Sequence, residues 1–473
     1  MLKRPALYTD FYELTMAQGY FLEGRSRERS GFDYFFRKLP FEGGYVVFAG
    51  LADLLPILEN FSFHPDELEY LREQGFHGDF IQYLKEMELS VSINAPKEGE
   101  IVFPTEPVVT VEGPIIQAQL IETLLLNILN FESLIATKAR RMRYAAGERG
   151  VLDFGLRRAQ GLGGMQATKA AAIGGVQPTS NVLAAFKYNI APSGTMAHSW
   201  IQSFDDELTA FRSYARHYPD DCILLVDTYD TLAQGVPHAI TVAKELEKDG
   251  HRLKGIRLDS GDLTYFSRKA RNQLDRAGLE YVKIAASNQL DEHLITSLIN
   301  QKAPIDLFGV GTRLVTGNET PALDGVYKLN SINDEPKLKI SENVEKITLP
   351  GAKKTMRYLD EDDNFLGDGV WLIDEKSPQR IYHPFISSKS SDVSAYKHKP
   401  IQQTVMKNGE LTVDIPTVDE SAAYTEKRFK KLNMEHKRFE HPHIYKVGVS
   451  EKLLNLRDDL IDEAKNGHRR RVR

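Results

Sequence analysis

The densest group of chemically able residues in the sequence is Arg257-Leu-Asp-Ser-Gly-Asp262, which ends a short apolar run. Asp262 can be explained as the cap of a following helix, but Arg257 and Asp259 cannot. Alternate residues of a strand point to the same face, so these two side chains should lie together inside the fold. Burying a charged pair is costly unless a ligand or a metal uses it. The segment therefore predicts a site for a charged ligand.

A second acidic group, Asp227-Thr-Tyr-Asp230, comes one structural unit earlier in the chain. Taken alone, it is equally well explained as a capped helix start. Two acid-bearing strand ends on one rim are, however, what a Mg²⁺-polyphosphate substrate requires. Mg²⁺ takes one or two protein carboxylates together with waters and substrate oxygens. Asp227 and Asp259 are therefore the predicted magnesium ligands.

Two glycine- and serine-rich segments could hold a phosphate. Gly309 and Gly311 directly follow an apolar run, and Ser287 ends the run before it. Backbone that approaches closely can present successive N–H groups to a phosphate. A single G-x-G also occurs in ordinary turns, so it is the combination of the two segments that predicts a monophosphate pocket.

His198 lies in Gly194-Thr-Met-Ala-His-Ser199, a short loop or helix start. A lone histidine is more often a packing or surface residue than a catalytic one. Its position among the other polar strand ends is what makes it a candidate.

The elements that must position these residues repeat one pattern between Val151 and Leu314. Each repeat is an apolar run, a group of Gly, Asp or Ser, and an amphipathic stretch, which is typical of βα units. The predicted strands are Val151–Gly155, Cys222–Asp227, Gly255–Asp259, Tyr281–Ala285 and Ile305–Gly309. Continuous apolar strands favour a parallel sheet, either open and doubly wound or closed. Polar residues at every strand end favour a (β/α) barrel, where these ends converge on one face.

Three segments are expected along the chain. Residues 1–112 mix helical and extended stretches and are predicted to form an α+β domain, and residues 113–320 the catalytic barrel. Residues 321–473 are predicted to be a β-rich module with a Lys/Glu-rich helical tail, packing with the N-terminal domain. The fold class is therefore α/β, a barrel with a flanking α+β or β domain and a helical C-terminal segment.

Charge and composition narrow the function further. The 473 residues include 60 Lys and Arg against 66 Asp and Glu, a net charge of -6 that gives no footprint for nucleic acid. Cys222 is the only cysteine, so no internal disulfide is possible. The most apolar stretch, 115–131, is interrupted by polar residues and is predicted to be a buried helix, not a membrane span. We expect a cytoplasmic protein without a membrane or nucleic-acid partner.

The ordered motifs resemble the nicotinate phosphoribosyltransferase family along nearly the whole chain. They are Tyr8-Thr-Asp-Phe-Tyr-Glu-Leu-Thr15, Phe36-Arg-Lys-Leu-Pro40, Asp153-Phe-Gly-Leu-Arg-Arg158, Thr179-Ser-Asn181, Gly194-Thr-Met-Ala-His-Ser-Trp200, Asp227-Thr-Tyr-Asp230, Gly255-Ile-Arg-Leu-Asp-Ser-Gly-Asp262, Ser287-Asn288 and Phe308-Gly-Val-Gly-Thr-Arg313. The resemblance implies an irregular, type II phosphoribosyltransferase-like (β/α) barrel. It also implies synthesis of nicotinate mononucleotide and diphosphate from nicotinate and 5-phosphoribosyl 1-diphosphate, coupled to ATP hydrolysis in NAD salvage. The resemblance further implies a homodimer with active sites shared between the subunits.

The resemblance also implies roles for the residues that would bind nicotinate. Phe154 would stack on the pyridine ring, and Tyr12 of a second copy would cover its other face. Arg157 would pair with the nicotinate carboxylate or a nearby phosphate. Thr179 and Ser180 belong to the implied substrate loop.

Further implied roles concern the anions and the reaction itself. Arg257, Asp259 and Asp227 would hold the ribose and the Mg²⁺-diphosphate. The implied phosphate and diphosphate ligands are Ser287, Gly309, Gly311 and, across a dimer interface, Arg37 and Lys328. His198 aligns with the histidine that ATP transiently phosphorylates.

Three other functions are compatible with a barrel of this kind. In the related nicotinamide phosphoribosyltransferases an Asp accepts the amide N–H, whereas the corresponding residue here is Ser180, which favours the acid as substrate. Pro178 departs from the family pattern, in which a glycine is expected before Thr-Ser-Asn. A non-catalytic phosphosugar sensor would be supported by loss of the catalytic side chains, which are present. An aldolase-like barrel would need a Schiff-base lysine, and Lys283 lies inside its strand without an obvious partner.

Overall fold

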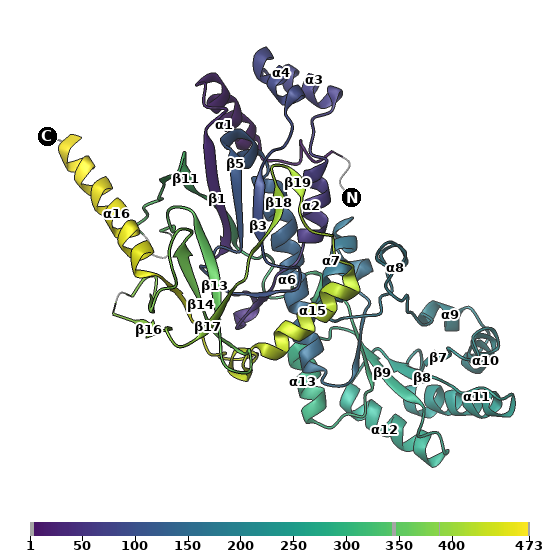
Figure 1. Cartoon of the computed structure of the whole chain (residues 1–473). Coiled ribbons are helices and arrows are strands. Elements are labelled where there is room, and N and C mark those ends of the chain that lie inside the picture. Colours follow the sequence, from purple (N-terminus) through teal and green to yellow (C-terminus); the bar gives the residue numbers. More distant parts are fainter. Residues whose placement is uncertain (1–3, 343–346, 387, 472–473) are drawn as a thin grey trace. The chain divides into compact units, whose positions relative to one another are not determined.

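The computed structural model describes residues 4–342, 347–386 and 388–471 (Figure 1). The contacts that residues make in space divide the chain into two compact units. Met1–Leu134 and Ala322–Arg473 make up unit 1, and Ile135–Pro321 makes up unit 2. The expected second segment began at residue 113, but β5 (Val109–Pro114) and α5 (Ile115–Leu120) pack with α1 (Phe11–Leu22) and β1 (Arg29–Phe36) in unit 1.

Unit 2 is built on a five-stranded parallel sheet with the order β6-β10-β9-β8-β7. Its strands are β6 (Gly150–Asp153), β7 (Ile223–Leu225), β8 (Gly255–Leu258), β9 (Lys283–Ser287) and β10 (Leu307–Val310). The strands β7 to β10 neighbour one another in chain order, and β6 lies beside β10. In a doubly wound sheet the order of the strands reverses at a central switch point. Here the order does not reverse, and the first strand lies beside the last, as in a (β/α) barrel.

The barrel wall continues past β6 through isolated bridges. Asp153 pairs in parallel with Thr179, and Thr179 pairs in parallel with Pro192. These single bridges replace full strands, which makes the barrel irregular.

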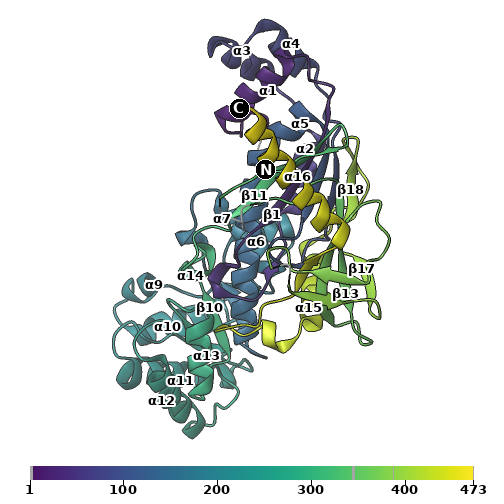
Figure 2. The same cartoon turned by 90° about the vertical axis from the view of Figure 1, so that its left-hand side faces the viewer.

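Helices follow the strands of unit 2, four between β6 and β7 and one after each later strand, and several of them are grouped below β10 in Figure 2. They are α7 (Gly163–Ile173), α8 (Val182–Tyr188), α9 (His198–Gln202), α10 (Glu207–His217), α11 (Val236–Lys248), α12 (Leu263–Arg276), α13 (Glu292–Asn300) and α14 (Thr312–Val315). The side chain of Asp262 accepts the backbone N–H of Tyr265 and caps α12. This confirms the structural explanation of Asp262 and leaves Arg257 and Asp259 for function.

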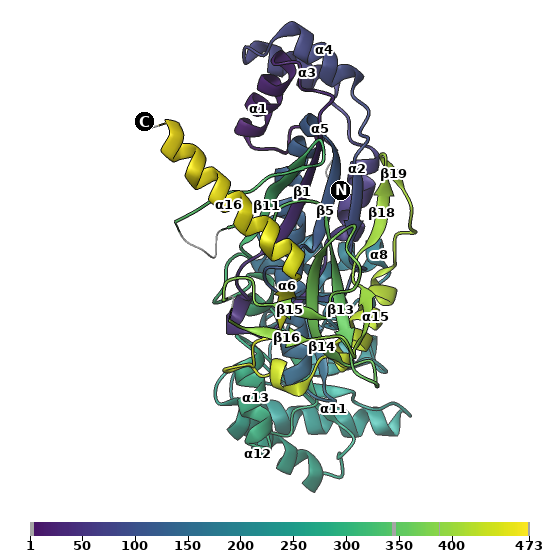
Figure 3. The same cartoon turned by 60° about the vertical axis from the view of Figure 1, so that its left-hand side comes forward.

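Unit 1 contains a seven-stranded sheet with the order β12-β11-β1-β5-β3-β18-β19. Besides β1 and β5, its strands are β3 (Ser92–Ala95), β11 (Gly325–Ile332), β12 (Glu335–Pro336), β18 (Gln403–Lys407) and β19 (Glu410–Leu411). Figure 3 shows β1 and β5 side by side, and β3 lies between β5 and β18 in the sheet. Because β11 pairs with β1 and β18 with β3, residues from both ends of the chain share one sheet.

Unit 1 also contains a six-stranded sheet with the order β16-β15-β20-β14-β13-β17 and a two-stranded sheet of residues 46–47 and 101–102. The strands of the six-stranded sheet are β13 (Lys353–Leu359), β14 (Phe365–Leu372), β15 (Arg380–Tyr382), β16 (Ser390–Asp392), β17 (Lys397–Pro400) and β20 (Val447–Val449). The helices of this unit include α2 (Leu51–Glu59), α3 (Pro65–Glu73), α4 (Gly78–Glu86), α15 (Val418–Lys431) and α16 (Glu451–Arg471), the helical C-terminal segment.

The apolar stretch near residue 115 forms helix in the structure, as α5 and then α6 (Glu122–Ala145). Among the described residues, Ile115–Ala145 is the one helical stretch long and apolar enough to cross a membrane by length and composition. However, 72% of its most apolar window is buried inside the protein, as in the core helix of many folds. Length and composition are therefore weak evidence for a span here.

Candidate active site

Arg257 and Asp259 lie together at the carboxyl end of β8, as strand alternation predicts. The Arg257 Nη2 donates to Asp259 Oδ1 at 2.7 Å. The same guanidinium donates to Ser287 Oγ on β9 at 2.9 Å and to Thr195 Oγ1 at 3.0 Å. The hydroxyl of Ser287 donates in turn to Asp259 Oδ1. These bonds hold the two charged groups rigidly, while 15% of the Arg257 side chain and 29% of the Asp259 side chain stay accessible.

The carboxylate of Asp227, which follows β7, is bonded to the segment that follows β8. Its Oδ2 accepts the backbone N–H of Asp259 at 2.7 Å and the hydroxyl of Ser260 at 2.8 Å. Its other oxygen, Oδ1, is buried, and no described residue offers it a hydrogen bond. Asp230, by contrast, caps the helical turn Thr231–Gly235 by accepting two backbone N–H groups. The two acids of this motif therefore differ: Asp230 is a helix cap, whereas Asp227 is bonded to the segment after β8 and keeps one buried carboxylate oxygen without a hydrogen bond among the described residues.

The carboxylates fit a cation that brings most of its own ligands. No cluster of three or more His, Cys, Asp or Glu residues suited to a metal occurs in the described residues. Mg²⁺ needs only one or two carboxylates when substrate oxygens and waters complete its shell. The unpartnered, buried Oδ1 of Asp227 is the group that such an ion would satisfy.

A cavity of about 160 Å³ opens beside Arg257 and Asp259. It is lined by Phe154, Arg157, Arg158, Arg257, Asp259, Ser287, Asn288, Gln289, Gly309, Gly311 and Thr312. The cavity thus combines an aromatic ring, three arginines, one carboxylate and the glycine- and serine-rich strand ends. An anionic ligand that carries a flat ring would match this lining.

Gly309 of β10 leaves room for the ring of Phe154. A Cβ at Gly309 would lie 2.6 Å from two ring carbons of Phe154, closer than side-chain atoms can approach. The Arg257 guanidinium lies 5.3 Å from the centre of the same ring, within reach of a cation–π contact. Phe154 is therefore wedged between Gly309 and Arg257 at the wall of the cavity.

Asn288 and Gln289, which follow Ser287 in the glycine- and serine-rich segments predicted to hold a phosphate, also line the cavity. Asn288 and Gln289 have φ values of 82° and 51°, in the left-handed region that few side chains adopt. The turn directs both residues to the cavity that Ser287 lines. Asn is tolerated in this conformation more often than most residues.

Thr179 is placed differently from the expectation. It is buried, and its hydroxyl donates to Asp153 Oδ2 at 2.8 Å, beside the hydroxyl of Thr168 at 2.9 Å. The backbone N–H of Ser180 donates to the Asp153 carbonyl at 2.8 Å, and Ser180 is half-buried. In this structure Thr179 lies outside the cavity lining and ties its loop to the end of β6, next to Phe154.

His198 begins α9 and is half-buried. Its Nδ1 lies 3.0 Å from the hydroxyl of Thr228, the residue after Asp227. The structure thus brings His198 next to the acidic strand end, as its position in the sequence suggested. The imidazole is held on one nitrogen by a neutral hydroxyl.

Tyr12, Arg37 and Lys328 belong to unit 1. Tyr12 lies on α1 and is 47% exposed, and burial and the nearby Glu122 carboxylate raise the pKa of its phenol. Arg37 follows β1, and its buried Nε has no hydrogen-bond partner among the described residues. Burial lowers the pKa of the Arg37 guanidinium. Lys328 lies on β11, half-buried. None of the three shares a unit with the cluster around Arg257.

Sequence comparison identifies the family of the chain. Models of the nicotinate phosphoribosyltransferase N-terminal domain, family and C-terminal domain match residues 7–130, 150–366 and 352–457. Nicotinate phosphoribosyltransferase of Bacillus subtilis is 44% identical over 98% of this chain and 96% of its own length. The chain belongs to the nicotinate phosphoribosyltransferase family. A relative of the same name from Caenorhabditis elegans is 38% identical over 94% of this chain and 92% of its own.

Solved structures place the fold in the same family. Human nicotinic acid phosphoribosyltransferase superposes with a TM-score of 0.83 at 30% identity, covering 96% of this chain and 99% of that one. A nicotinate-nucleotide pyrophosphorylase from Pyrococcus furiosus gives a TM-score of 0.71 at 25% identity, covering 90% and 95%. The type II phosphoribosyltransferase fold is confirmed.

The geometry of this family member also bears on the aldolase-like alternative. Lys283 is exposed at the start of β9, and its ammonium group pairs with Asp306 at 3.2 Å. Strand starts lie at the opposite end of a parallel barrel from the carboxyl ends that carry the site. Lys283 is therefore not positioned as a Schiff-base lysine.

Proposed function

We propose that this protein synthesises nicotinate mononucleotide and diphosphate from nicotinate and 5-phosphoribosyl 1-diphosphate, with ATP hydrolysis coupled to turnover, in the cytoplasmic salvage of NAD. The observation that carries the proposal is the rigid Arg257–Asp259–Ser287 group beside Phe154 in one cavity. Membership of the nicotinate phosphoribosyltransferase family supports it.

The cavity offers separate places for the ring and for the phosphate. Phe154 presents a ring for stacking on the pyridine, and Arg157 supplies a cation for the carboxylate of nicotinate or for a phosphate. Ser287, Gly309 and Gly311 present backbone and hydroxyl groups for the 5-phosphate. Thr179 and Ser180 act by shaping the loop next to Phe154, since the Thr179 hydroxyl is already bonded to Asp153.

The chemical step needs charge stabilisation more than proton transfer. The pyridine nitrogen of nicotinate attacks C1 of the ribose as the bond from C1 to the diphosphate oxygen breaks. Positive charge builds on the ribose and negative charge on the departing diphosphate. We assign the first role to the Asp259 carboxylate and the second to the Arg257 guanidinium, which line the same cavity.

Magnesium is the expected cofactor, held by Asp227 and Asp259 together with substrate oxygens. The buried Oδ1 of Asp227, which has no partner in the described residues, supports this assignment. When bound, Mg²⁺ neutralises charge on the leaving diphosphate. The Asp227 Oδ2 is committed to the Asp259 N–H, so the carboxylate is held in a fixed orientation.

His198 is the proposed acceptor of the phosphoryl group of ATP. It lies next to the Asp227 strand end, where added charge would alter the binding of Mg²⁺ and diphosphate. Tyr12, Arg37 and Lys328 are proposed to complete the site of a second copy in a homodimer. Their support is the family resemblance and the lack of a bonded partner for the Arg37 Nε among the described residues.

The test of this function is a comparison of two substrates. Purified protein with 5-phosphoribosyl 1-diphosphate and Mg²⁺ is given nicotinate or nicotinamide, with and without ATP, and mononucleotide is measured by chromatography. We expect kcat/KM for nicotinate to exceed that for nicotinamide by far more than tenfold, because Arg157 lines the cavity and can pair with the nicotinate carboxylate, and Ser180 stands where the nicotinamide enzymes have an Asp. Equal turnover of the two would contradict the assignment.

A second prediction concerns the space that Gly309 leaves for Phe154. Gly309→Ala should displace the ring, because its Cβ would lie 2.6 Å from two ring carbons. We expect KM for nicotinate to rise about tenfold, since about 1.4 kcal/mol of ring contact is a tenfold effect. Gly194→Ala is the matched control in the same unit, because its Cβ would meet nothing within 4 Å. Steady-state kinetics of both variants check this, and equal KM values in the two would refute the packing argument.

A further inference from the structure

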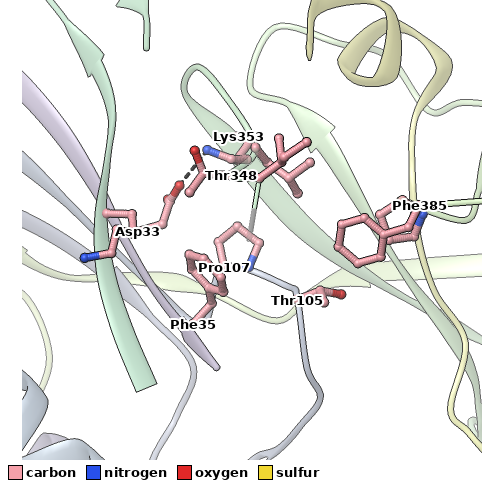
Figure 4. Close-up of a pocket in the computed structure, with 11 residues that line it drawn as sticks. Asp33, Phe35, Thr105, Pro107, Thr348, Lys353 and Phe385 are labelled. Atoms are coloured by element: carbon pink, nitrogen blue, oxygen red, sulfur yellow. Dashed lines mark hydrogen bonds and ion pairs between the residues drawn. The ribbon is translucent and has the colours of Figure 1, made fainter. Parts of the chain in front are cut away.

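A second group of charges lies in unit 1, around a narrow cavity of about 20 Å³. Asp33 and Phe35 of β1, Lys328 of β11 and Lys353 of β13 all contribute to its wall. Figure 4 shows the Asp33 carboxylate and the Lys353 ammonium facing each other at one side, away from Phe385. The cavity is too small for a substrate, so its charges must act on each other or on a ligand outside it.

Asp33 and Lys353 form a fully buried ion pair. The Lys353 Nζ lies 2.6 Å from Asp33 Oδ2, and the exposed fractions of the two side chains are 0% and 4%. Lys353 also donates to the Gly351 carbonyl at 2.7 Å. Thr110 donates to the other oxygen of Asp33 at 3.2 Å. The carboxylate is therefore neutralised by one cation and satisfied on both oxygens.

Lys328 is the direct cross-strand partner of Asp33 in the pairing of β1 with β11. Opposed residues of antiparallel strands have Cβ atoms about 4.5–5.5 Å apart and point to the same face. An opposite-charge pair between Lys328 and Asp33 is thus the arrangement that the register by itself favours. Yet no hydrogen bond or ion pair joins Lys328 to another residue in the described part of the chain, and the Asp33 carboxylate is bonded to Lys353 instead.

The Glu122 carboxyl is another acid near Lys328, and it competes only weakly with a substrate anion for the ammonium group. Burial raises the pKa of the Glu122 carboxyl, and the positive charge of Lys328 partly opposes that rise. Glu122 accepts a hydrogen bond from Gln119 at 2.7 Å, which engages one of its oxygens. Lys328 is half-buried in β11 and keeps its ammonium group for another anion.

We propose that Lys353 is a positioning residue: by neutralising Asp33 it keeps Lys328 available for the diphosphate group of the substrate. The inference rests on the proposed function, in which Lys328 meets diphosphate in the site of a second copy. Without the Lys353 charge, the Asp33 carboxylate draws Lys328 across the strand pair. Lys328 then binds a fixed protein anion in place of the substrate anion, and affinity for 5-phosphoribosyl 1-diphosphate falls.

Two matched variants separate this role from simple support of the fold. Lys353→Gln and Asp33→Asn each neutralise one partner of the same buried pair, and each leaves the other charge buried and unpaired. Only Lys353→Gln leaves a carboxylate opposite Lys328. We expect KM for 5-phosphoribosyl 1-diphosphate to rise five- to tenfold in Lys353→Gln, with KM for nicotinate unchanged. In Asp33→Asn, KM for 5-phosphoribosyl 1-diphosphate should stay within twofold of the parent or fall. Equal effects in the two variants overturn the proposal.

Lys328→Ala distinguishes the failure of this inference from the failure of the proposed function. In the parent background it should raise KM for 5-phosphoribosyl 1-diphosphate, and in the Lys353→Gln background it should add less than twofold, because Lys328 is already diverted. If Lys328→Ala leaves KM unchanged in an active parent, the role of Lys328 is refuted and this inference with it. If the effects multiply independently, only the inference about Lys353 is refuted. A parent without phosphoribosyl transfer would refute the function itself.

A milder variant serves if Lys353→Gln does not fold. Thr110→Val keeps the ion pair but removes the donor to Asp33 Oδ1. The released oxygen should attract Lys328 and raise KM for 5-phosphoribosyl 1-diphosphate two- to threefold, with KM for nicotinate unchanged. An unchanged KM for 5-phosphoribosyl 1-diphosphate in this folded variant overturns the proposal.

Discussion

Replacing Asp259 by asparagine should lower kcat about a thousandfold and leave the fold intact. Asparagine keeps the size of the side chain and can still accept from Arg257 and Ser287, so the local hydrogen bonds persist. What it removes is the negative charge beside the ribose as C1 becomes positive. Loss of one preorganised electrostatic group in an active site commonly costs about 10²–10³ in kcat.

Asp262→Asn is the matched control, three residues further along the same segment. Asp262 caps α12 by accepting from the Tyr265 N–H, and asparagine is about as good an N-cap as aspartate. We expect kcat within twofold of the parent and almost no change in melting temperature. Steady-state kinetics and thermal unfolding of both variants give the comparison. If Asp259→Asn kept full kcat, the carboxylate would have no part in the chemical step.

His198→Asn should abolish ATP hydrolysis and ATP stimulation while a slower, ATP-independent phosphoribosyl transfer persists. The physical reason is that the residues proposed to stabilise the transition state, Arg257 and Asp259, are bonded to each other and not to His198. Removing the phosphoryl acceptor leaves them in place. The parent should incorporate acid-labile ³²P from γ-labelled ATP, and the variant should not.

His238→Asn supplies the control for loss of a histidine in the same unit. His238 is a partly buried residue of α11, and its Nδ1 lies 2.9 Å from Glu207 Oε2. This variant should keep both the label and the ATP stimulation. Label that persists in His198→Asn, or is lost equally in His238→Asn, would refute the phosphohistidine assignment.

Much of unit 2 could be predicted because its structure is local. Each of β6 to β10 falls within or beside a predicted apolar run, and α12 begins at Leu263, as predicted, because Asp262 caps it. The juxtaposition of Arg257 with Asp259 followed from strand alternation alone. The choice between barrel and doubly wound sheet also followed, since polar residues at every strand end are typical of a single converging face.

Other features of the site could not be predicted, because they depend on residues distant in sequence. Thr179 belonged to a substrate motif, but its hydroxyl is bonded to Asp153, 26 residues away. The expected division after residue 112 followed the change of sequence pattern. In the structure unit 1 continues to Leu134 and therefore includes α5. Packing, and not pattern, decides which segments share a core.

The family, the barrel strands and the polar strand ends could be predicted from the sequence alone, because strand period and helix caps act over a few residues. The pairing of the charges, in contrast, depends on tertiary packing. Asp33 and Lys353 are 320 residues apart, yet they form one buried pair that leaves Lys328, the neighbour of Asp33 across the strands, without a bonded partner among the described residues. No local rule predicts that choice, because a buried carboxylate binds whichever cation the packing of the seven- and six-stranded sheets brings within reach.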